Sequence, residues 1–256
     1  MLKKRIIFSL LFSEGYFNLS RNFRLQKIGD IDWLLNNYNF SNVSRSIDEL
    51  IVLDVTRGER EPNKFIEAIN KISEGVFIPI SLGGGIKSFD EAKTYFESGA
   101  DKIIMNSSLA TNPQLIDEIS SIYGSQSIVA YLDIKKEGEE YFLYINNGSE
   151  KVQVDIKEFI LNLINKNIGE LVINSMDKDG TGMDFLYETI ELLPSTIEIP
   201  VMISGGAGNY NHLFSALSDK RVDAVVTANL LNFVGDGLIN ARKEILANGV
   251  NLAVWD

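Results

Sequence analysis

The segment ELIVLD, residues 49–54, decides the fold, because its opening returns as ELVIN at residues 170–174, which is 121 positions further along the chain. Three further pairs keep this spacing to within one residue: Ile78-Pro79 with Ile199-Pro200, Gly84-Gly85 with Gly205-Gly206, and DKIIMNSSL from 101 with DAVVTANLL from 223. Agreement among several separate segments indicates an internal repeat rather than chance. The chain is therefore interpreted as a duplicated half, with four strands in each copy.

Short apolar segments alternate with amphipathic segments along the whole chain. Continuous apolar runs are typical of strands in a parallel sheet, and the periodic segments between them are typical of the helices that cover it. The expected strands are residues 5–10, 49–54, 78–82, 101–105, 127–133, 170–174, 199–204 and 222–227, and the clearest helices are 62–73, 88–98, 112–123, 156–166 and 210–219. Eight such units in 256 residues predict a single (β/α)8 TIM barrel that occupies 1–256 as one domain. An open doubly wound sheet is the alternative.

The composition narrows the possible partners and chemistries. The net charge is −11, and an acidic surface repels phosphate backbones and anionic lipids, so neither nucleic acid nor a membrane is expected as a partner. The chain has no cysteine, which excludes disulfides, thiolate nucleophiles and cysteine–zinc sites. Its one histidine, His212, is expected to be a surface or packing residue and not a catalytic one. We therefore expect neither a metal nor a cofactor. The start MLKKRIIFSLLF lacks a cleavage site, so a cytoplasmic protein is expected.

Two glycine-rich turns follow strands at equivalent places in the two halves, LGGGIKS at 82–88 and SGGAGNY at 204–210. Glycine lets backbone N–H groups approach an anion, and the N-terminus of the following helix adds partial positive charge. The next strand in each half ends in a polar pair, Asn106-Ser107 and Ala228-Asn229, and TANLLNF (227–233) resembles the short extra helix of barrel phosphate sites. These features predict two phosphate subsites for a small phosphorylated ligand. Ordinary structural turns are the alternative.

One carboxylate is expected at the centre of the same mouth of the barrel. Asp133 ends its strand there, and a carboxylate in this position is suited to general acid–base catalysis. Capping of the next loop is the alternative. The half-repeat places its counterpart at residue 11, across the barrel, where the chain has Leu11. Leucine transfers no proton, so a mechanism that needs carboxylates on both sides of a substrate is not supported. Asp54 and Asp179 also end strands, although the Asp179-Gly180 pair is equally a turn signal.

Over essentially its full length the chain resembles the cyclase subunit of imidazole glycerol phosphate synthase. The segments that carry the resemblance are KRII (4–7), DELIVLD (48–54), GGGI (83–86), GADKI (99–103), GSQSIV (124–129), the LD that ends in Asp133, GELVINSMDKDG (169–180) and SGGAG (204–208). The resemblance implies a barrel that binds a bis-phosphate and pairs with a glutaminase subunit, whose ammonia travels through the barrel. It assigns Asp133 as one of two catalytic aspartates. It also implies phosphate contacts at Gly85, Asn106 and Ser107 on one side, and at Asp179, Gly180, Gly206, Ala228 and Asn229 on the other.

The opposite face of the barrel matches the family's ammonia entrance. A ring of two positive and two negative residues gates that path in the family, and its positions fall on Arg5, Glu49, Lys102 and Glu170. The alternative is that these are solvated charges that flank strands. Asp101 matches a family position near the glutaminase interface. Because this chain lacks the cysteine nucleophile that glutamine hydrolysis uses in such systems, we expect a partner to supply the ammonia.

The departures from the family lie at the active-site mouth. The second catalytic aspartate falls on Leu11, and a lysine of the loop after the first strand falls near Leu19, where Arg21 is the neighbouring cation. The segment 12–29 is expected to be a long mobile loop. SLL at 9–11 and GEREPNKF at 58–65 resemble a side branch of the family that works with a glutaminase-like partner and a separate ATP-dependent amidotransferase.

Three functions remain open on the sequence alone. The resemblance to the side branch implies an ammonia-conducting subunit for amidation of a bacterial surface sugar. The first alternative is an active cyclase (lyase) subunit of histidine biosynthesis, in which another group such as Ser13 or Glu14 replaces the missing aspartate. The second is a scaffold that binds a bis-phosphate and has no catalytic role.

Overall fold

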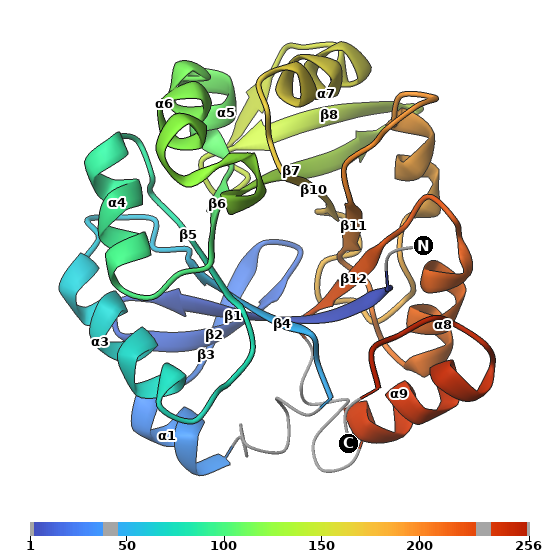
Figure 1. Cartoon of the computed structure of the whole chain (residues 1–256), viewed down its shortest axis with the longest axis horizontal. Coiled ribbons are helices and arrows are strands. Elements are labelled where there is room, and N and C mark those ends of the chain that lie inside the picture. Colours follow the sequence, from blue (N-terminus) through green and yellow to red (C-terminus); the bar gives the residue numbers. More distant parts are fainter. Residues whose placement is uncertain (1–2, 38–45, 229–236, 255–256) are drawn as a thin grey trace.

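A computed structural model describes residues 3–37, 46–228 and 237–254 of the chain. Eight parallel strands form a closed ring in the order β1, β4, β5, β6, β7, β10, β11 and β12, and β12 pairs back with β1. Their bounds are Arg5–Ser13, Glu49–Asp54, Ile80–Gly83, Lys102–Met105, Ile128–Glu137, Glu170–Ser175, Val201–Ser204 and Ala224–Thr227. Figure 1 looks down this ring, with the helices outside it. The predicted (β/α)8 barrel is confirmed, and pairing of β7 with β10 rules out an open sheet.

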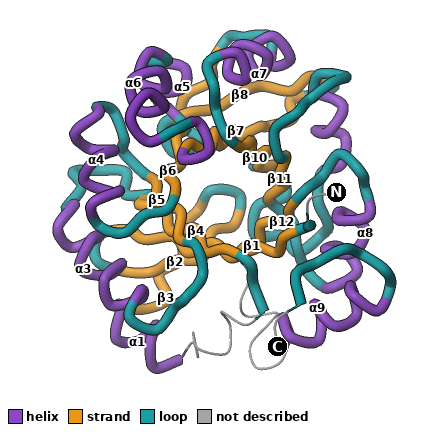
Figure 2. Tube along the Cα trace, in the orientation of Figure 1, coloured by secondary structure: helices purple, strands orange, loops and turns teal. Residues whose placement is uncertain are grey.

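Helices cover the outside of the ring, as the tube in Figure 2 shows. They are α1 (Ile31–Asn37), α3 (Pro62–Ser73), α4 (Phe89–Glu97), α5 (Ser107–Thr111), α6 (Gln114–Tyr123), α7 (Ile156–Asn165), α8 (Tyr210–Ser218) and α9 (Gly237–Ala247), with short 3-10 helices at Ser125–Ser127 and Tyr187–Leu192. The five helices expected from periodicity lie within two residues of their predicted bounds. Most of the expected extra helix at 227–233 lies outside the described residues.

Alternation along the strands separates two apolar regions. In β1, Ile6, Phe8 and Leu10 face the helices and belong to the large outer core, whereas Ile7 belongs to a smaller cluster inside the ring. That inner cluster contains nine buried side chains, namely Ile7, Ile51, Ile104, Val129, Tyr131, Val172, Met202, Ala224 and Val226. Alternate side chains of a strand point to the same face, so Arg5, Ser9 and Leu11 point into the ring together with Ile7. Strand β1 therefore contributes side chains to the interior along its whole length.

Two hairpins extend from equivalent strands of the two halves. Strand β1 continues into β2 (Tyr16–Arg21) and β3 (Arg24–Gly29), and β7 continues into β8 (Glu140–Ile145) and β9 (Glu150–Val152), all antiparallel. The expectation that residues 12–29 form a loop is therefore wrong. Phe17 of β2 is buried, the other side chains of β2 and β3 are half-buried or exposed, and β2 pairs in register with the end of β1.

A buried ion pair joins the last helix to the start of β4. The guanidinium of Arg242 binds both carboxylate oxygens of Asp48 at 2.8 Å and donates to the carbonyl of Ala253 at 2.6 Å. Asp48 also accepts from the amide of Ile6 at 2.8 Å. One carboxylate thus links β1, the start of β4 and α9.

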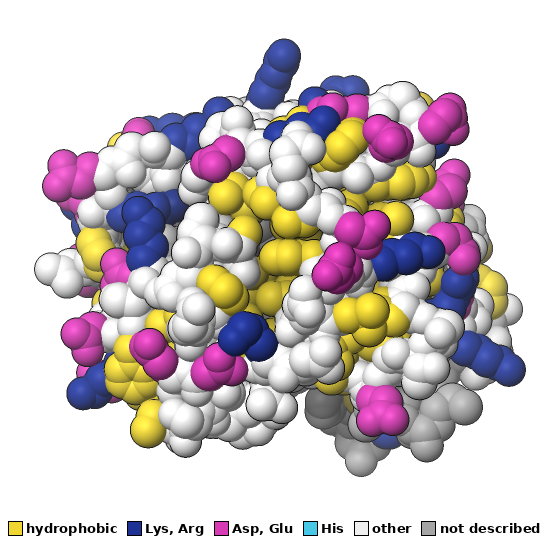
Figure 3. Space-filling model, turned by 90° about the horizontal axis from the view of Figure 1, so that it is seen from above, with side chains coloured by type: hydrophobic (Ala, Val, Ile, Leu, Met, Phe, Trp, Pro, Cys, Tyr) yellow, Lys and Arg dark blue, Asp and Glu magenta, His cyan; other side chains and the backbone are white. Residues whose placement is uncertain are grey.

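The described helices include none that is long and apolar enough to cross a membrane. In the view turned by 90°, acidic and basic side chains are interspersed over the visible face and no large basic patch is seen (Figure 3). This face therefore gives no structural sign of a surface built for a polyanion.

Candidate functional site

A cavity of about 570 Å³ opens at the carboxyl ends of the barrel strands. The residues predicted from sequence that line it are Leu11, Gly85, Asn106, Ser107, Asp133, Asp179 and Ala228. Gly180 and Gly206 do not contribute to its described wall, and Asn229 lies outside the described residues. The hairpin β2–β3 and the turn between β8 and β9 also contribute to the wall, through Phe23 and Asn146 among others.

Asp133 is the most perturbed carboxyl group of this cavity. It lies on β7 and accepts hydrogen bonds from the side-chain amides of Asn174 at 2.8 Å and Asn106 at 3.1 Å. Burial raises its pKa to about 7, although both hydrogen bonds act in the opposite direction. Near neutral pH this carboxyl group is therefore divided between its two forms, which is the condition for accepting or donating a proton.

Leu11 occupies the opposite wall. In the ring of eight strands β1 and β7 stand four places apart, so Leu11 and Asp133 project into the cavity from opposite sides. Leu11 pairs laterally with Leu53 of β4, and both leucines line the cavity. Ser13 and Glu14, which sequence reasoning left open as substitutes for the missing aspartate, are not part of the described wall. Glu14 has a positive φ of 53° in the β1–β2 turn.

The two other carboxylates of the described wall, Asp54 and Asp179, already have partners within the protein. Asp54 accepts from the amide of Thr56 at 2.9 Å and lies 3.6 Å from Nε of Arg60. Asp179 accepts from the hydroxyl of Ser20 at 2.5 Å and from the amide of Phe23 at 2.9 Å, so it fastens the β2–β3 hairpin to the loop after β10. Burial raises the pKa of Asp179 above its ordinary value.

The two glycine turns differ in what they contact. Gly85 (φ +75°) lines the cavity, and the turn leads into α4, whose N-cap Ser88 forms a capping box with Glu91. Gly206 instead packs under the loop after β10, because a Cβ on it would lie 2.0 Å from the carbonyl oxygen of Asp184. Gly180 likewise packs against the hairpin, since its Cβ would lie 1.9 Å from the carbonyl oxygen of Ser20. Close backbone packing therefore explains both of these glycines.

The polar pair after β6 also has partners within the protein. Asn106 donates to the main-chain carbonyl of Tyr131 at 2.8 Å as well as to Asp133, so its amide positions the carboxyl group. The hydroxyl of Ser107 accepts from the amide of Asn146 at 3.0 Å and thereby holds the β8–β9 turn at the rim.

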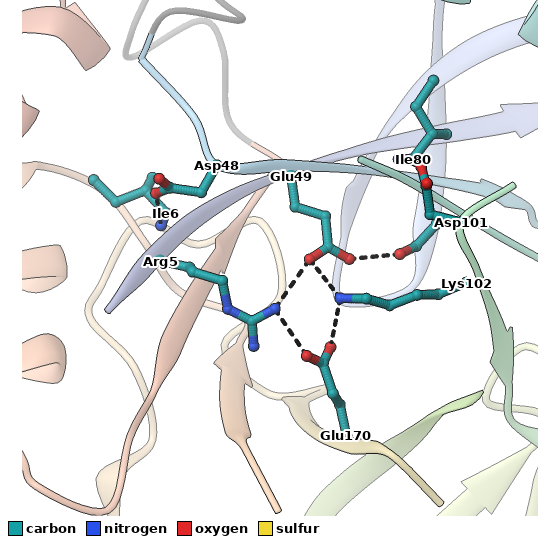
Figure 4. A network of polar contacts seen from close by, with 9 residues as sticks. Arg5, Ile6, Asp48, Glu49, Ile80, Asp101, Lys102 and Glu170 are labelled. Carbon is teal, nitrogen blue, oxygen red and sulfur yellow. Dashed lines mark hydrogen bonds and ion pairs between the residues drawn. The ribbon is translucent and has the colours of Figure 1, made fainter. Parts of the chain in front are cut away.

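At the opposite end of the barrel, four charged side chains form a closed ring (Figure 4). Nη1 of Arg5 lies 3.1 Å from Oε2 of Glu49 and 2.9 Å from Oε1 of Glu170, and Nζ of Lys102 lies 2.8 Å and 3.0 Å from the same two carboxylates. Ser81 donates to the second oxygen of Glu49 at 2.5 Å. Glu49 is 2% exposed. These residues are therefore not charges that flank strands in solvent.

Asp101, expected at a partner interface, lies beside this ring. Its carboxylate accepts from the amide of Ile80 at 2.8 Å, in the way that Asp223 accepts from Val201 at 3.0 Å. His212 lies at the start of α8 and accepts from the amide of Gly208 at 3.1 Å, consistent with a packing role. Across the described ranges, no three acidic or histidine side chains are arranged to hold a metal ion.

Sequence reasoning missed Tyr131, which belongs to the inner apolar cluster and also lines the cavity. Its side chain points inward from β7, and its hydroxyl reaches Oγ of Ser204 on β11 at 3.2 Å. Burial, together with the nearby Asp133, raises the pKa of this phenol. The alternation Val129, Tyr131, Asp133 within one buried strand was the available signal, because it places all three side chains on the inner face.

Comparisons with known proteins agree with this architecture. The model of a family described as "Histidine biosynthesis protein" matches residues 31–235. The chain is 46% identical over 256 residues to "Putative imidazole glycerol phosphate synthase subunit hisF2" of Parasynechococcus marenigrum (strain WH8102), covering 100% of this chain and 95% of that protein. It is 34% identical over 252 residues to the imidazole glycerol phosphate synthase subunit HisF of Chlorobium phaeovibrioides, covering 98% and 99%. The corresponding subunit of Chlorobium chlorochromatii is 34% identical over 250 residues, with 98% of each chain covered.

Proposed function

The chain belongs to the histidine biosynthesis protein family, among relatives of the HisF subunit of imidazole glycerol phosphate synthase, and we propose that it conducts ammonia rather than closing an imidazole ring. One observation carries the proposal: Leu11 faces the cavity from the wall opposite Asp133. A ring closure that moves protons on both sides of a substrate lacks its second carrier here, since the wall opposite Asp133 presents Leu11 beside Leu53.

The ionic ring supports the first half of this function. Two cations and two carboxylates hold one another around the barrel axis at the amino ends of the strands, and the inner apolar cluster lies between them and the cavity. A glutaminase subunit would dock on this face, near Asp101, and deliver ammonia to the ring. The partner is required because the chain has no cysteine for glutamine hydrolysis by thiolate attack.

The acceptor in this proposal is a bacterial surface sugar, amidated by a separate ATP-dependent amidotransferase. The support is the side-branch pattern, SLL at 9–11 and GEREPNKF at 58–65. The second of these segments forms the cavity rim after β4, through Gly58 and Arg60, before α3 begins at Pro62. The pattern thus coincides with residues at the mouth from which ammonia would leave.

An active cyclase in histidine biosynthesis is the second candidate. The observation that favours it is Asp133, whose pKa of about 7 suits a general acid or base. This function requires a proton carrier at the Leu11 side that the described wall does not supply.

Turnover with free ammonia separates the two candidates. The purified chain, given ammonium salts and the bis-phosphate intermediate of histidine biosynthesis without any glutaminase, is expected to form no imidazole product. A Leu11→Asp variant restores the missing carboxylate, and Leu11→Asn is its matched uncharged control. Measurable turnover by the wild type would overturn the ammonia-conducting proposal in favour of the cyclase.

The conducting role is tested with the cognate glutaminase. Addition of the chain is expected to raise glutamine hydrolysis by that partner, and sugar amidation in the full system is expected to need both. Arg5→Ala should lower glutamine-dependent amidation while amidation from free ammonium continues. Equal activity of Arg5→Ala with both nitrogen sources would exclude passage through the ring.

A further inference from the structure

The side chains inside the barrel are arranged in layers, and the strand register identifies the members of each layer. In a barrel of eight parallel strands, alternate strands supply the four side chains of a layer. The hydroxyl of Tyr131 on β7 lies 3.2 Å from Oγ of Ser204 on β11, so these two belong to one layer. Ser204 lies two residues beyond Met202, which is the lateral counterpart of Tyr131 through Val172 of β10. The same step of two strands and two residues, repeated round the barrel, returns to Tyr131, as the stagger of a closed barrel requires.

This layer contains one large side chain and three small positions. Its members are Ser9, Gly83, Tyr131 and Ser204. A Cβ on Gly83 would lie 2.8 Å from Cδ2 of Leu53 and 2.8 Å from Cβ of Ile104, so this position has no room for a side chain. Protein interiors are close-packed, and a bulky side chain extends into the space that small neighbours leave. The phenol of Tyr131 therefore extends into the middle of the layer.

The same phenol lies at the boundary between the inner apolar cluster and the cavity. Of the nine side chains in that cluster, Tyr131 and Ile104 line the cavity, and the remaining members are at most 1% exposed. Strand β10 lies between the two strands that the contact with Ser204 bridges. On β10, Val172 belongs to the buried cluster, whereas Asn174 lines the cavity. The bridge thus separates a buried valine from an amide of the cavity wall, and all eight strands around it lie within the described residues.

The phenol is held weakly enough to move. Within the described part of the chain its hydroxyl makes one hydrogen bond, to Ser204, and the net free energy of such a bond is small. The half-repeat places Ser9 across the barrel from Tyr131, and this small side chain also lines the cavity, so there is room on that side. Burial, together with Asp133, raises the pKa of Tyr131, so the phenol remains uncharged at neutral pH.

We propose that Tyr131 is a door between the apolar interior and the cavity, closed by its hydrogen bond to Ser204 and opened when the phenol turns toward Ser9. The inference deepens the proposed function and rests on it for the molecule that passes: ammonia from the ionic ring crosses the level of Tyr131 before it reaches Asp133. The interior is then closed at one end by charges and at the other by an uncharged phenol. While the door is closed, water of the cavity is kept away from the apolar cluster.

Thiol labelling tests the door, because the chain has no cysteine of its own. Val172→Cys places a thiol beneath the phenol, and Leu11→Cys, in a separate protein, places one on the cavity wall. Each is treated with methyl methanethiosulfonate, a small uncharged reagent that a thiolate attacks with release of methanesulfinate, and mass spectrometry follows the rate. With Tyr131 intact, Leu11→Cys is expected to react at least about tenfold faster than Val172→Cys.

Variants of the door should change the rate at Val172→Cys and leave the rate at Leu11→Cys within about twofold. Tyr131→Phe and Ser204→Ala each remove the closing hydrogen bond and should speed labelling by about fivefold, and the double variant by no more than either, because both remove the same bond. Tyr131→Ala removes the phenol and should speed labelling by at least about tenfold. The matched control, Phe65→Ala, removes a buried aromatic ring from the outer core and should change the rate by less than about twofold.

Four results would overturn the proposal. They are labelling of Val172→Cys beneath intact Tyr131 as fast as that of Leu11→Cys, unchanged labelling in Tyr131→Ala, unchanged labelling in both Tyr131→Phe and Ser204→Ala, and equal acceleration by Phe65→Ala, which would assign access to unfolding. Circular dichroism of each variant confirms that it is folded. No reagent contains ammonia, so failure of the door leaves the conducting role to be decided by Arg5→Ala, and failure of that role leaves these labelling rates unaffected.

Discussion

The hydroxyl of Tyr131 lies 3.2 Å from Oγ of Ser204, so a side chain of β7 reaches past β10 to β11 at the floor of the cavity. Tyr131 belongs to the inner apolar cluster and also lines the cavity, so the two regions meet at this residue. It also lies two residues before Asp133 on the same inner face, and the carboxyl group of Asp133 is one of the causes that raise the pKa of the phenol.

Two variants of Tyr131 should separate the contribution of its hydroxyl group to stability from that of its ring. Tyr131→Phe keeps the ring and loses one hydrogen bond, and we expect the free energy of unfolding to fall by about 1 kcal/mol. Tyr131→Ala leaves a cavity and should lower it by about 3–5 kcal/mol. Urea denaturation measures both. Equal losses in the two variants would show that the hydroxyl, not the ring, carries the contribution.

Asp133 should titrate near neutral pH. Its pKa is raised to about 7 in the fold by burial, whereas an unfolded chain has about 3.9. Between these values the native state holds a proton that the unfolded state has lost, so the contribution of Asp133 is fully present below about pH 4 and is lost as the pH rises through 7. A carboxyl ¹³C resonance with a midpoint near 7, absent in Asp133→Asn, is the direct measurement. A midpoint near 4 would contradict the prediction.

The ionic ring should make a large contribution to stability compared with surface pairs. Glu49 touches Arg5, Lys102 and Ser81 and is almost fully buried. Glu49→Ala leaves two cations without this carboxylate, and we expect a loss of about 3–5 kcal/mol in the free energy of unfolding. The matched control is Glu61→Ala, which removes an exposed pair with Lys64 and should change the free energy of unfolding far less, because solvent screens the pair. Similar losses in both variants would refute the distinction.

The β2–β3 hairpin should depend on Asp179. This carboxylate receives hydrogen bonds from Ser20 and Phe23, and the amide of Asn22 donates to its main-chain carbonyl at 2.9 Å. Asp179→Ala removes the side-chain contacts and should speed amide hydrogen exchange in residues 16–29 by about tenfold, while exchange in β10 is unchanged. Ser20→Ala should have the same effect in smaller measure. Uniform acceleration over the barrel would instead indicate global destabilisation.

The barrel itself was predictable because its signal is repeated. Each of the eight strands is a buried apolar run. Because the segments recur about 121 residues later, a strand assigned in one half supports the corresponding strand in the other half. The β2–β3 hairpin was missed because segments such as RLQKIG mix polar and apolar residues and bury little. Its order comes from pairing with β1 and from Asp179, which are contacts that distant parts of the chain supply.

The site was predictable in its residue types but not in their roles. Asp133 and Leu11 follow from strand position and the repeat, and both line the cavity. Glycine at 85 and at 206 looks the same in sequence, yet one lies beneath an arginine and the other beneath a carbonyl oxygen. A glycine can allow a ligand to approach the backbone or can allow another backbone segment to pack closely. Only the loop that lies next to each glycine shows which of these two roles it has.

If ammonia crosses the barrel as proposed, the apolar cluster inside it would admit the neutral base and exclude the ammonium ion. An ion that leaves the ring for these nine side chains loses its hydration, which in an idealised low-dielectric medium costs on the order of 20 kcal/mol, whereas a neutral molecule has no such penalty. In the proposed conducting role, ammonium would therefore have to give up its proton before it passes these nine side chains, and Asp133 lines the cavity beyond them. The proposed role would thus place loss of the proton and its return at two different levels of the barrel.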